Sequence, residues 1–192
     1  MSTIFSLRRA AWVTLGIGLG LGAGPARAES EQALSVGLGW ATFSALGEAM
    51  DGREPPSLSP TIGGSLGVSY ERHIGTDFAL RAELVGGLFY GGGDEKKMQS
   101  QTSNALLADV GAALRFDVLK YVPYAFVGVG AVTTGGGPLD RGTDPVLVVG
   151  GGLDWLQSRA RSYGLEARIA SFGGDVTVVT IGLRGTTRWG YF

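Results

Sequence analysis

The sequence predicts an all-β protein, an eight-stranded antiparallel up-and-down transmembrane β-barrel. Three observations predict this fold: segments in which bulky apolar and small residues alternate, breaks that alternate in length, and charges on the face opposite the apolar one. In segment 34–40, Leu, Val, Leu and Trp occupy every second position, so one face of a strand is apolar. A soluble barrel would turn that face inward, whereas charges on the opposite face favour an apolar exterior.

Eight segments carry the pattern, and most are close to the roughly 9–11 residues that a tilted membrane strand requires. The predicted strands are Ala33–Phe43, Thr61–Arg72, Phe78–Tyr90, Ala105–Asp117, Pro123–Thr133, Val146–Leu156, Ser162–Ser171 and Val176–Gly185. For the last strand a second interpretation extends it to Phe192. Long and short connections alternate up to the last one, at 172–175, which is short. Short periplasmic turns and long outer loops are typical of outer-membrane barrels.

The facing of the fifth segment has two interpretations. Either Val127 and Val129 face lipid with Tyr124 and Phe126 inside, or the reverse.

The first 28 residues have the three parts of a secretory signal peptide. Arg8 and Arg9 form the basic region, an apolar stretch covers Ala10 to Gly24, and Ala26-Arg27-Ala28 fits the cleavage site. An uncleaved membrane anchor is the weaker alternative, because the apolar stretch is short and rich in glycine. We predict a signal peptide over residues 1–28, a barrel domain over residues 29–192, and export to the outer membrane.

Composition excludes several classes of function. The chain has no cysteine, so it forms no disulfide and has no lipoprotein anchor or thiolate metal site. It contains 17 acidic and 16 basic residues, and three of the basic ones leave with the signal peptide, so we expect no nucleic-acid partner. The loop acids Asp94, Glu95, Asp140 and Asp144 are interpreted as solvated rather than metal-binding, and no cofactor is expected.

Charged residues interleaved with glycine are predicted to fill the barrel interior. An eight-stranded barrel is only wide enough for side chains, so buried charges must pair and need glycine opposite them. Every predicted interior cation is arginine, which suits rigid bidentate pairing. This lumen charge network, interpreted as structural, comprises Glu71, Arg81, Glu83, Asp109, Arg115, Asp117, Asp154, Glu166, Arg168 and Arg184.

Aromatic residues cluster near the ends of the predicted strands. Aromatic rings concentrate at the two bilayer interfaces of membrane proteins, so this placement favours a membrane barrel. The predicted interface aromatics are Tyr70, Phe78, Phe116, Trp155, Tyr163 and Trp189 at the periplasmic rim, with Trp40 and Tyr90 at the outer rim.

Over the mature chain, the sequence resembles the small outer-membrane β-barrels of the OmpA/OmpX-like superfamily, and four segments of the predicted strands carry the resemblance. They are residues 123–130 (PYAFVGVG), 150–155 (GGGLDW), 165–168 (LEAR) and 179–184 (VTIGLR), together with the terminal Phe192. The resemblance implies a barrel-assembly signal at the C-terminus, read from Tyr191 or Phe192, because Phe192 is out of step with the lipid-facing residues. It also implies barrel-assembly machinery and periplasmic chaperones as partners during biogenesis, with outer-membrane lipid and lipopolysaccharide around a monomer.

The favoured function is that of a non-enzymatic barrel that supports envelope integrity or binds at the surface through its outer loops. A narrow pore is the alternative. A lipid-modifying enzyme is less favoured: Ser44, Ser57 and Ser59 have no histidine partner among the outer loops, and we expect the lone His73 in a solvated periplasmic turn. A soluble carrier would need an apolar cavity, which inward charges contradict.

Overall fold

A computed structural model of the 192-residue chain describes residues 31–46, 57–60, 62–91, 102–116, 120–136, 142–172 and 176–190. The strands are β1 (Gln32–Leu46), β2 (Ser57–Leu58), β3 (Ile62–Ile74), β4 (Phe78–Tyr90), β5 (Thr102–Arg115), β6 (Tyr121–Gly135), β7 (Gly142–Leu156), β8 (Arg161–Phe172) and β9 (Val176–Trp189). The predicted signal peptide, the assembly signal at Tyr191 and Phe192, and Asp117 lie outside the described residues.

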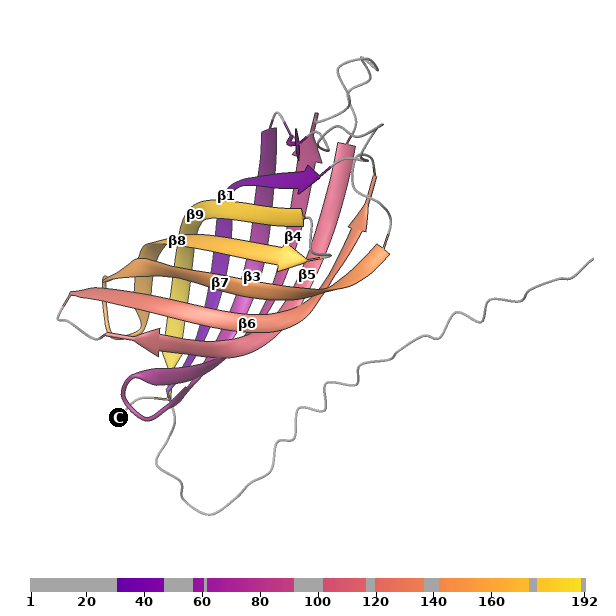
Figure 1. Ribbon diagram of the computed structural model, residues 1–192. Coiled ribbons are helices and arrows are strands. Elements are labelled where there is room, and N and C mark those ends of the chain that lie inside the picture. Colours follow the sequence, from indigo (N-terminus) through magenta and orange to yellow (C-terminus); the bar gives the residue numbers. More distant parts are fainter. Residues whose placement is uncertain are drawn as a thin grey trace, which may run out of the picture.

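The long strands close into a barrel (Figure 1). Each pairs antiparallel with the next along the chain, in the order β1-β3-β4-β5-β6-β7-β8-β9, and β9 pairs back onto β1. The closing seam extends from the pair Gln32 and Trp189 to the pair Ala45 and Val176. The predicted eight-stranded antiparallel up-and-down barrel is thereby confirmed. The two-residue β2, which the sequence pattern did not predict, pairs with the last residues of β1.

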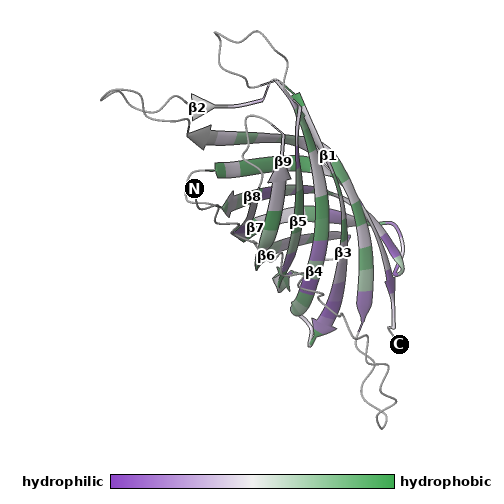
Figure 2. Ribbon diagram, turned by 90° about the vertical axis from the view of Figure 1, so that its right-hand side faces the viewer, coloured by the Kyte–Doolittle hydropathy of each residue, from purple (hydrophilic) through white to green (hydrophobic). Residues whose placement is uncertain are grey.

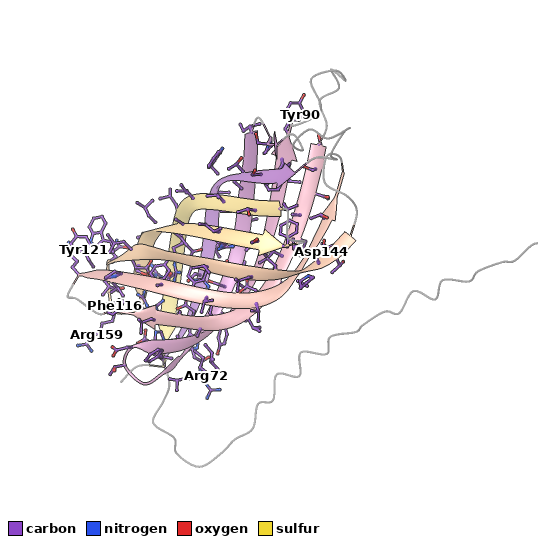
Figure 3. All side chains as sticks on the ribbon, in the orientation of Figure 1. Arg72, Tyr90, Phe116, Tyr121, Asp144 and Arg159 are labelled. Atoms are coloured by element: carbon purple, nitrogen blue, oxygen red, sulfur yellow. The ribbon has the colours of Figure 1, made fainter. Side chains whose placement is uncertain are left out.

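The barrel has two different ends. One end, called the turn end, carries the tight turn at 75–77, where Gly75 has a φ of 85°, and the turn at 157–160. Segments 47–56, 92–101, 137–141 and 173–175 connect strands at the other end, called the loop end, and lie outside the described residues. Figure 3 shows Arg72, Phe116, Tyr121 and Arg159 toward the turn end, with Tyr90 and Asp144 toward the loop end.

Exposed and buried side chains alternate along the strands, and hydrophobic and hydrophilic bands alternate along the ribbons in Figure 2. The outer face is apolar: Leu38 and Leu183, for example, are each 67% exposed. In β6, Val127 and Val129 are exposed while Tyr124 and Phe126 are buried, which confirms the first of the two interpretations of this strand. Among the described residues, no helix is long and apolar enough to cross a membrane.

Several strands extend beyond their predicted bounds. β5 begins at Thr102 but ends at Arg115, and β9 continues past Gly185 to Trp189, in agreement with the longer of its two interpretations. Strand pairing needs only backbone groups, so it continues where the apolar pattern has stopped. At the turn end, for instance, Arg188 N donates to Ala160 O at 2.8 Å.

Candidate functional site: the barrel interior

Nine of the ten predicted network residues are described, and all nine side chains point into the barrel. Inward positions recur at every second residue of a strand, which brings charges from six strands to one region. We call the ion-paired residues of this region the charged layer: Glu71, Arg81, Glu83, Arg115, Asp154, Glu166, Arg168, Arg184 and Arg188.

Glu71 is the first centre of the charged layer. Its side chain is fully buried, and its carboxylate accepts hydrogen bonds from three guanidinium groups on three different strands. Arg115 Nη2 lies 2.6 Å from Glu71 Oε2, while Arg81 Nη1 and Arg184 Nη2 each lie 3.4 Å from Oε1. One carboxylate thus holds together the strands β4, β5 and β9.

Glu166 on β8 is the second centre. Its carboxylate accepts hydrogen bonds from Arg168 Nη2 at 2.6 Å and from Arg81 Nη2 and Arg184 Nη1 at 3.0 Å each. The Tyr124 hydroxyl donates a further bond at 2.9 Å. Because Arg81 and Arg184 bind both Glu71 and Glu166, the two centres form one continuous network.

Two more acids complete the ion pairs. Glu83 accepts from Arg81 Nη2 at 3.0 Å and also pairs with Arg168. Asp154, which is fully buried, lies 3.0 Å from Arg188 Nη2 and 3.4 Å from Arg184 Nε. Buried carboxylates of this kind are tolerable because each meets at least one guanidinium group.

Aromatic rings support the arginines from one side. The guanidinium carbon of Arg81 lies 3.9 Å from the centre of the Phe126 ring, and that of Arg184 lies 4.4 Å from the Tyr124 ring. The ring faces attract the cations and fix the planes of their guanidinium groups. Tyr124 and Phe126 therefore position the arginines that the acids bind.

Glycine supplies the space that the large side chains require. A Cβ atom added to Gly152 would lie 2.5 Å from the Tyr124 hydroxyl oxygen, and one added to Gly128 would lie 2.5 Å from Asp109 Oδ1. Both distances are shorter than van der Waals contact. These positions admit no larger residue unless the neighbouring strand or side chain moves.

The structure differs from the predicted charge network at two residues, Asp109 and Arg188. Asp109 is buried, but its Oδ2 has no hydrogen-bond partner among the described residues. Its cross-strand neighbours are Glu83 and Gly130, neither of which is a cation, and the nearby arginines bind other acids. Arg188 was missed, although it shares the inward parity of Arg184.

His73 does not lie in a solvated turn, contrary to our expectation. It belongs to β3, is only 8% exposed, and its Nδ1 lies 3.2 Å from the backbone oxygen of Glu31. The strand continues to Ile74 before the turn begins, so His73 keeps the inward parity of Glu71. Its position at the turn end is as predicted.

The loop half of the interior is filled differently, by side chains that we call the apolar layer. Phe43 and Phe89 meet edge to face there, with ring centres 5.2 Å apart. The layer consists of Phe43, Val85, Phe89, Leu107, Val132, Val146, Val148, Phe172 and Val178. The sequence pattern did not predict this layer, because the apolar positions were assigned to the outer face alone.

Small cavities lie within the described part of the barrel. One of about 30 Å³ borders the charged layer near Ser35, Ser69 and Arg184, and one of about 40 Å³ lies within the apolar layer near Phe89 and Leu107. Arg168 lines both and marks the boundary between the layers. A volume of this size holds about two water molecules. Among the described residues, no group of three or more acidic or histidine side chains could hold a metal ion.

The eight predicted interface aromatics all lie on the outer face and are exposed. Trp189 and Tyr70 contact each other at the turn end, with ring centres 6.4 Å apart. Tyr121, which was not among the predicted interface aromatics, also lies at this end with 55% of its surface exposed. It pairs across strands with Trp155, which pairs in turn with Tyr163.

Solved structures of outer-membrane proteins share this architecture, although no similarity of sequence leads to them. No protein-family model matches the sequence, and no curated protein sequence does. Neisserial surface protein A has a TM-score of 0.63 at 14% identity, over 82% of this chain and 97% of that chain. Ail, the attachment invasion locus protein of Yersinia pestis, solved in complex with the heparin analogue sucrose octasulfate, has a TM-score of 0.55 at 16% identity, over 84% of this chain and 99% of that chain.

The N-terminal β-barrel domain of Pseudomonas aeruginosa OprF has a TM-score of 0.52 at 13% identity, over 84% of this chain and 98% of that chain. At these identities the similarity shows the fold. The chain therefore has the fold of small eight-stranded outer-membrane β-barrels.

Proposed function

We propose that the protein is an integral outer-membrane barrel without enzymatic activity, closed to ions, which reinforces the envelope and presents its loop end for surface binding. The observation that carries this proposal is the inversion of polarity. Ion-paired charges lie inside, while the outer face exposes leucine, valine and isoleucine around the barrel. Such a surface is stable in lipid and would aggregate in water.

The orientation follows from the two ends. Short turns of outer-membrane barrels face the periplasm and long connections face outward, so the loop end is placed at the cell surface. The exposed aromatics near the turn end, including Trp155 and Tyr163, then lie at the periplasmic interface, with Trp40 and Tyr90 nearer the outer one. Outer-membrane lipid and lipopolysaccharide surround a monomer, delivered by periplasmic chaperones to the barrel-assembly machinery.

The barrel interior supports a closed rather than a conducting state. An ion would have to separate the pairs around Glu71 and then cross the apolar layer at Phe43 and Phe89, whose aromatic rings do not replace its water. Both features argue against the narrow-pore hypothesis. The sole histidine of the chain, His73, lies at the turn end, far from the outer surface, which argues against a serine hydrolase acting there.

Cell fractionation tests membrane insertion directly. We expect the protein to stay in the membrane pellet after a sodium carbonate wash, and its unheated form to migrate faster than its boiled form on a gel. Release into the soluble fraction would contradict the proposal.

A pair of substitutions sharpens this test. The cost of an outward arginine falls from about 2–4 kcal/mol at the bilayer midplane to about 0–1 kcal/mol near the interfaces, so Leu153→Arg within the apolar band should cost more than Thr187→Arg at the turn end. The folded fraction in lipid vesicles should fall for the first variant and stay near wild type for the second. Equal folding of both would show that this face does not lie in lipid.

A further inference from the structure

The outer face is hollowed on one side of the barrel. A groove of about 540 Å³ crosses β7, β8, β9 and β1, and its polar lining is small. Leu153, Leu165, Leu183 and Leu38 follow one another across these four strands and form its apolar bed. Outward-facing side chains of a barrel normally give a convex surface, so the hollow needs a local cause.

Glycine provides that cause. Along the row next to the leucines, on the turn side, the outward residues are Tyr121, Trp155, Tyr163, Gly185 and Val36. Three aromatic side chains are thus followed by a residue with none, and the row of rings is interrupted at Gly185. The backbone at Gly185 forms the floor of the groove, and Tyr163 stands beside it as a wall.

The turn end of the groove carries positive charge. Lys120 Nζ lies 4.9 Å above the ring of Trp155, and Arg161 is the next outward residue of β8 beyond Tyr163. Both are exposed, as is Arg159 in the adjoining turn. Among the described residues, two acids of this end have exposed surface: Asp77, in the turn between β3 and β4, and Glu31, which is 35% exposed and pairs with Arg188. The groove therefore joins an apolar bed to a cationic rim.

We propose that this groove binds one anionic phospholipid of the adjacent leaflet, with an acyl chain on Gly185 and the leucine row and the phosphate between Lys120 and Arg161. The chemistry of the groove agrees with this ligand. A flexible hydrocarbon chain fits an open apolar channel, aromatic rings lie at the level of the glycerol backbone, and lysine and arginine bind phosphate. The inference rests on the proposed membrane insertion, because a bilayer lipid reaches the groove only there.

Fluorescence quenching by brominated lipid tests the site. In a mature chain carrying Trp40→Phe and Trp189→Phe, Trp155 is the only tryptophan and lies in the groove wall. The barrel is reconstituted in phosphatidylcholine vesicles that contain a minor fraction of brominated lipid, either phosphatidylglycerol or phosphatidylcholine. We expect phosphatidylglycerol to quench Trp155 more strongly, with about fivefold local enrichment for each basic residue that it contacts.

Matched variants identify the source of the preference. Lys120→Gln with Arg161→Gln should remove the excess quenching by phosphatidylglycerol, and Gly185→Leu should reduce quenching by both lipids as its side chain fills the groove. Arg72→Gln, a rim change on β3 away from the groove, should leave the preference unchanged. The unheated mobility on a gel reports that each variant is folded.

The outcomes separate this inference from the proposed function. Equal quenching by the two lipids in the parent barrel would overturn the lipid site while leaving insertion intact. No quenching by either lipid, with protein in the soluble fraction, would overturn insertion itself. Weak quenching combined with a crosslinked dimer, abolished by Gly185→Leu, would assign the groove to a second copy of the chain and overturn the lipid site.

Discussion

The two halves of the barrel interior exclude solvent by different chemistry. In the charged layer each carboxylate is held by guanidinium groups of other strands, and Glu71 alone binds three of them. In the apolar layer the rings of Phe43 and Phe89 and the surrounding aliphatic side chains fill the same cross-section without a single ion pair between them. The stability of the charged layer depends on specific ion-pair partners, whereas that of the apolar layer depends on how well its side chains fill the available volume.

This difference teaches where the molecule is sensitive. Loss of one member of a buried charge network leaves the remaining charges unpaired in a medium of low dielectric constant, so the cost exceeds that of the lost contact. Loss of an apolar side chain costs only its own transfer and the space it leaves. We therefore expect single substitutions to be more damaging in the charged layer than in the apolar one.

The largest effect is expected for Glu71→Gln. Removing one buried charge that binds three arginines should lower the free energy of unfolding by about 3–5 kcal/mol. Urea unfolding in lipid vesicles, followed by tryptophan fluorescence, measures it. Glu31→Gln is the matched control: its side chain is 35% exposed and forms one ion pair, of 3.6 Å, with Arg188. Similar losses for both variants would contradict the central role of Glu71.

Leu107→Ala tests the apolar layer and should cost less, about 2–4 kcal/mol. Leu107 is 7% exposed and lines the 40 Å³ cavity, whereas its neighbour Leu106 is 53% exposed on the outer face. Leu106→Ala on the same strand should therefore have the smaller effect in the same unfolding assay. If Leu106→Ala proved the more damaging of the two, the assignment of inner and outer faces in β5 would be wrong.

Gly152→Ala tests the space that glycine leaves for the charged layer. The added methyl group would clash with the backbone oxygen of Leu165 on the neighbouring strand and would lie 2.5 Å from the Tyr124 hydroxyl oxygen, so we expect a loss of about 1–3 kcal/mol. Gly37→Ala is the control, because its Cβ would lie 3.7 Å from the nearest heavy atom, a backbone oxygen. Unfolding midpoints that rank in the opposite order would show that both the β8 backbone at Leu165 and the Tyr124 side chain shift at little cost.

The smallest expected effect concerns conduction, where each layer suffices to close the barrel. Wild type, the double variant Arg81→Gln with Arg115→Gln, and Leu107→Ala should all show no stable ohmic current in planar bilayers. The double variant leaves acids unpaired and lowers stability, but the apolar layer remains. A steady current through the wild-type protein would put the narrow-pore hypothesis first.

Sequence patterning predicted the barrel well and its interior unevenly. The alternation of residue types predicted the inner and outer faces correctly where every second residue is small or charged, as along β1, β3 and β8. It left β6 ambiguous because both parities are bulky and apolar there: Tyr124 and Phe126 face inward while Val127 and Val129 face outward. Hydropathy alone does not separate an apolar interior layer from an apolar exterior. For the same reason, the phenylalanines of the loop half were not predicted to face the interior.

Individual partners in the charged layer were beyond prediction for a different reason. Ion pairing depends on how far each side chain reaches across the barrel. The position of a residue along its strand tells only whether its side chain points inward, not how far it reaches. Asp109 illustrates the failure: its parity is inward, yet its cross-strand neighbours are Glu83 and Gly130. Arg188 and His73 occupy every second position after Arg184 and Glu71. Strands predicted a few residues longer would therefore have placed both side chains inside the barrel.

The hydrogen bond between Arg184 and Glu71 has a consequence for how the barrel forms. It joins residues 113 positions apart, and the seam between β9 and β1 must close before the two can meet. In an open sheet these groups would still be hydrated, so the last strand to be synthesised also brings the final counter-charge. We expect sheet closure and loss of lumenal water to occur as one cooperative step, leaving no stable half-closed intermediate.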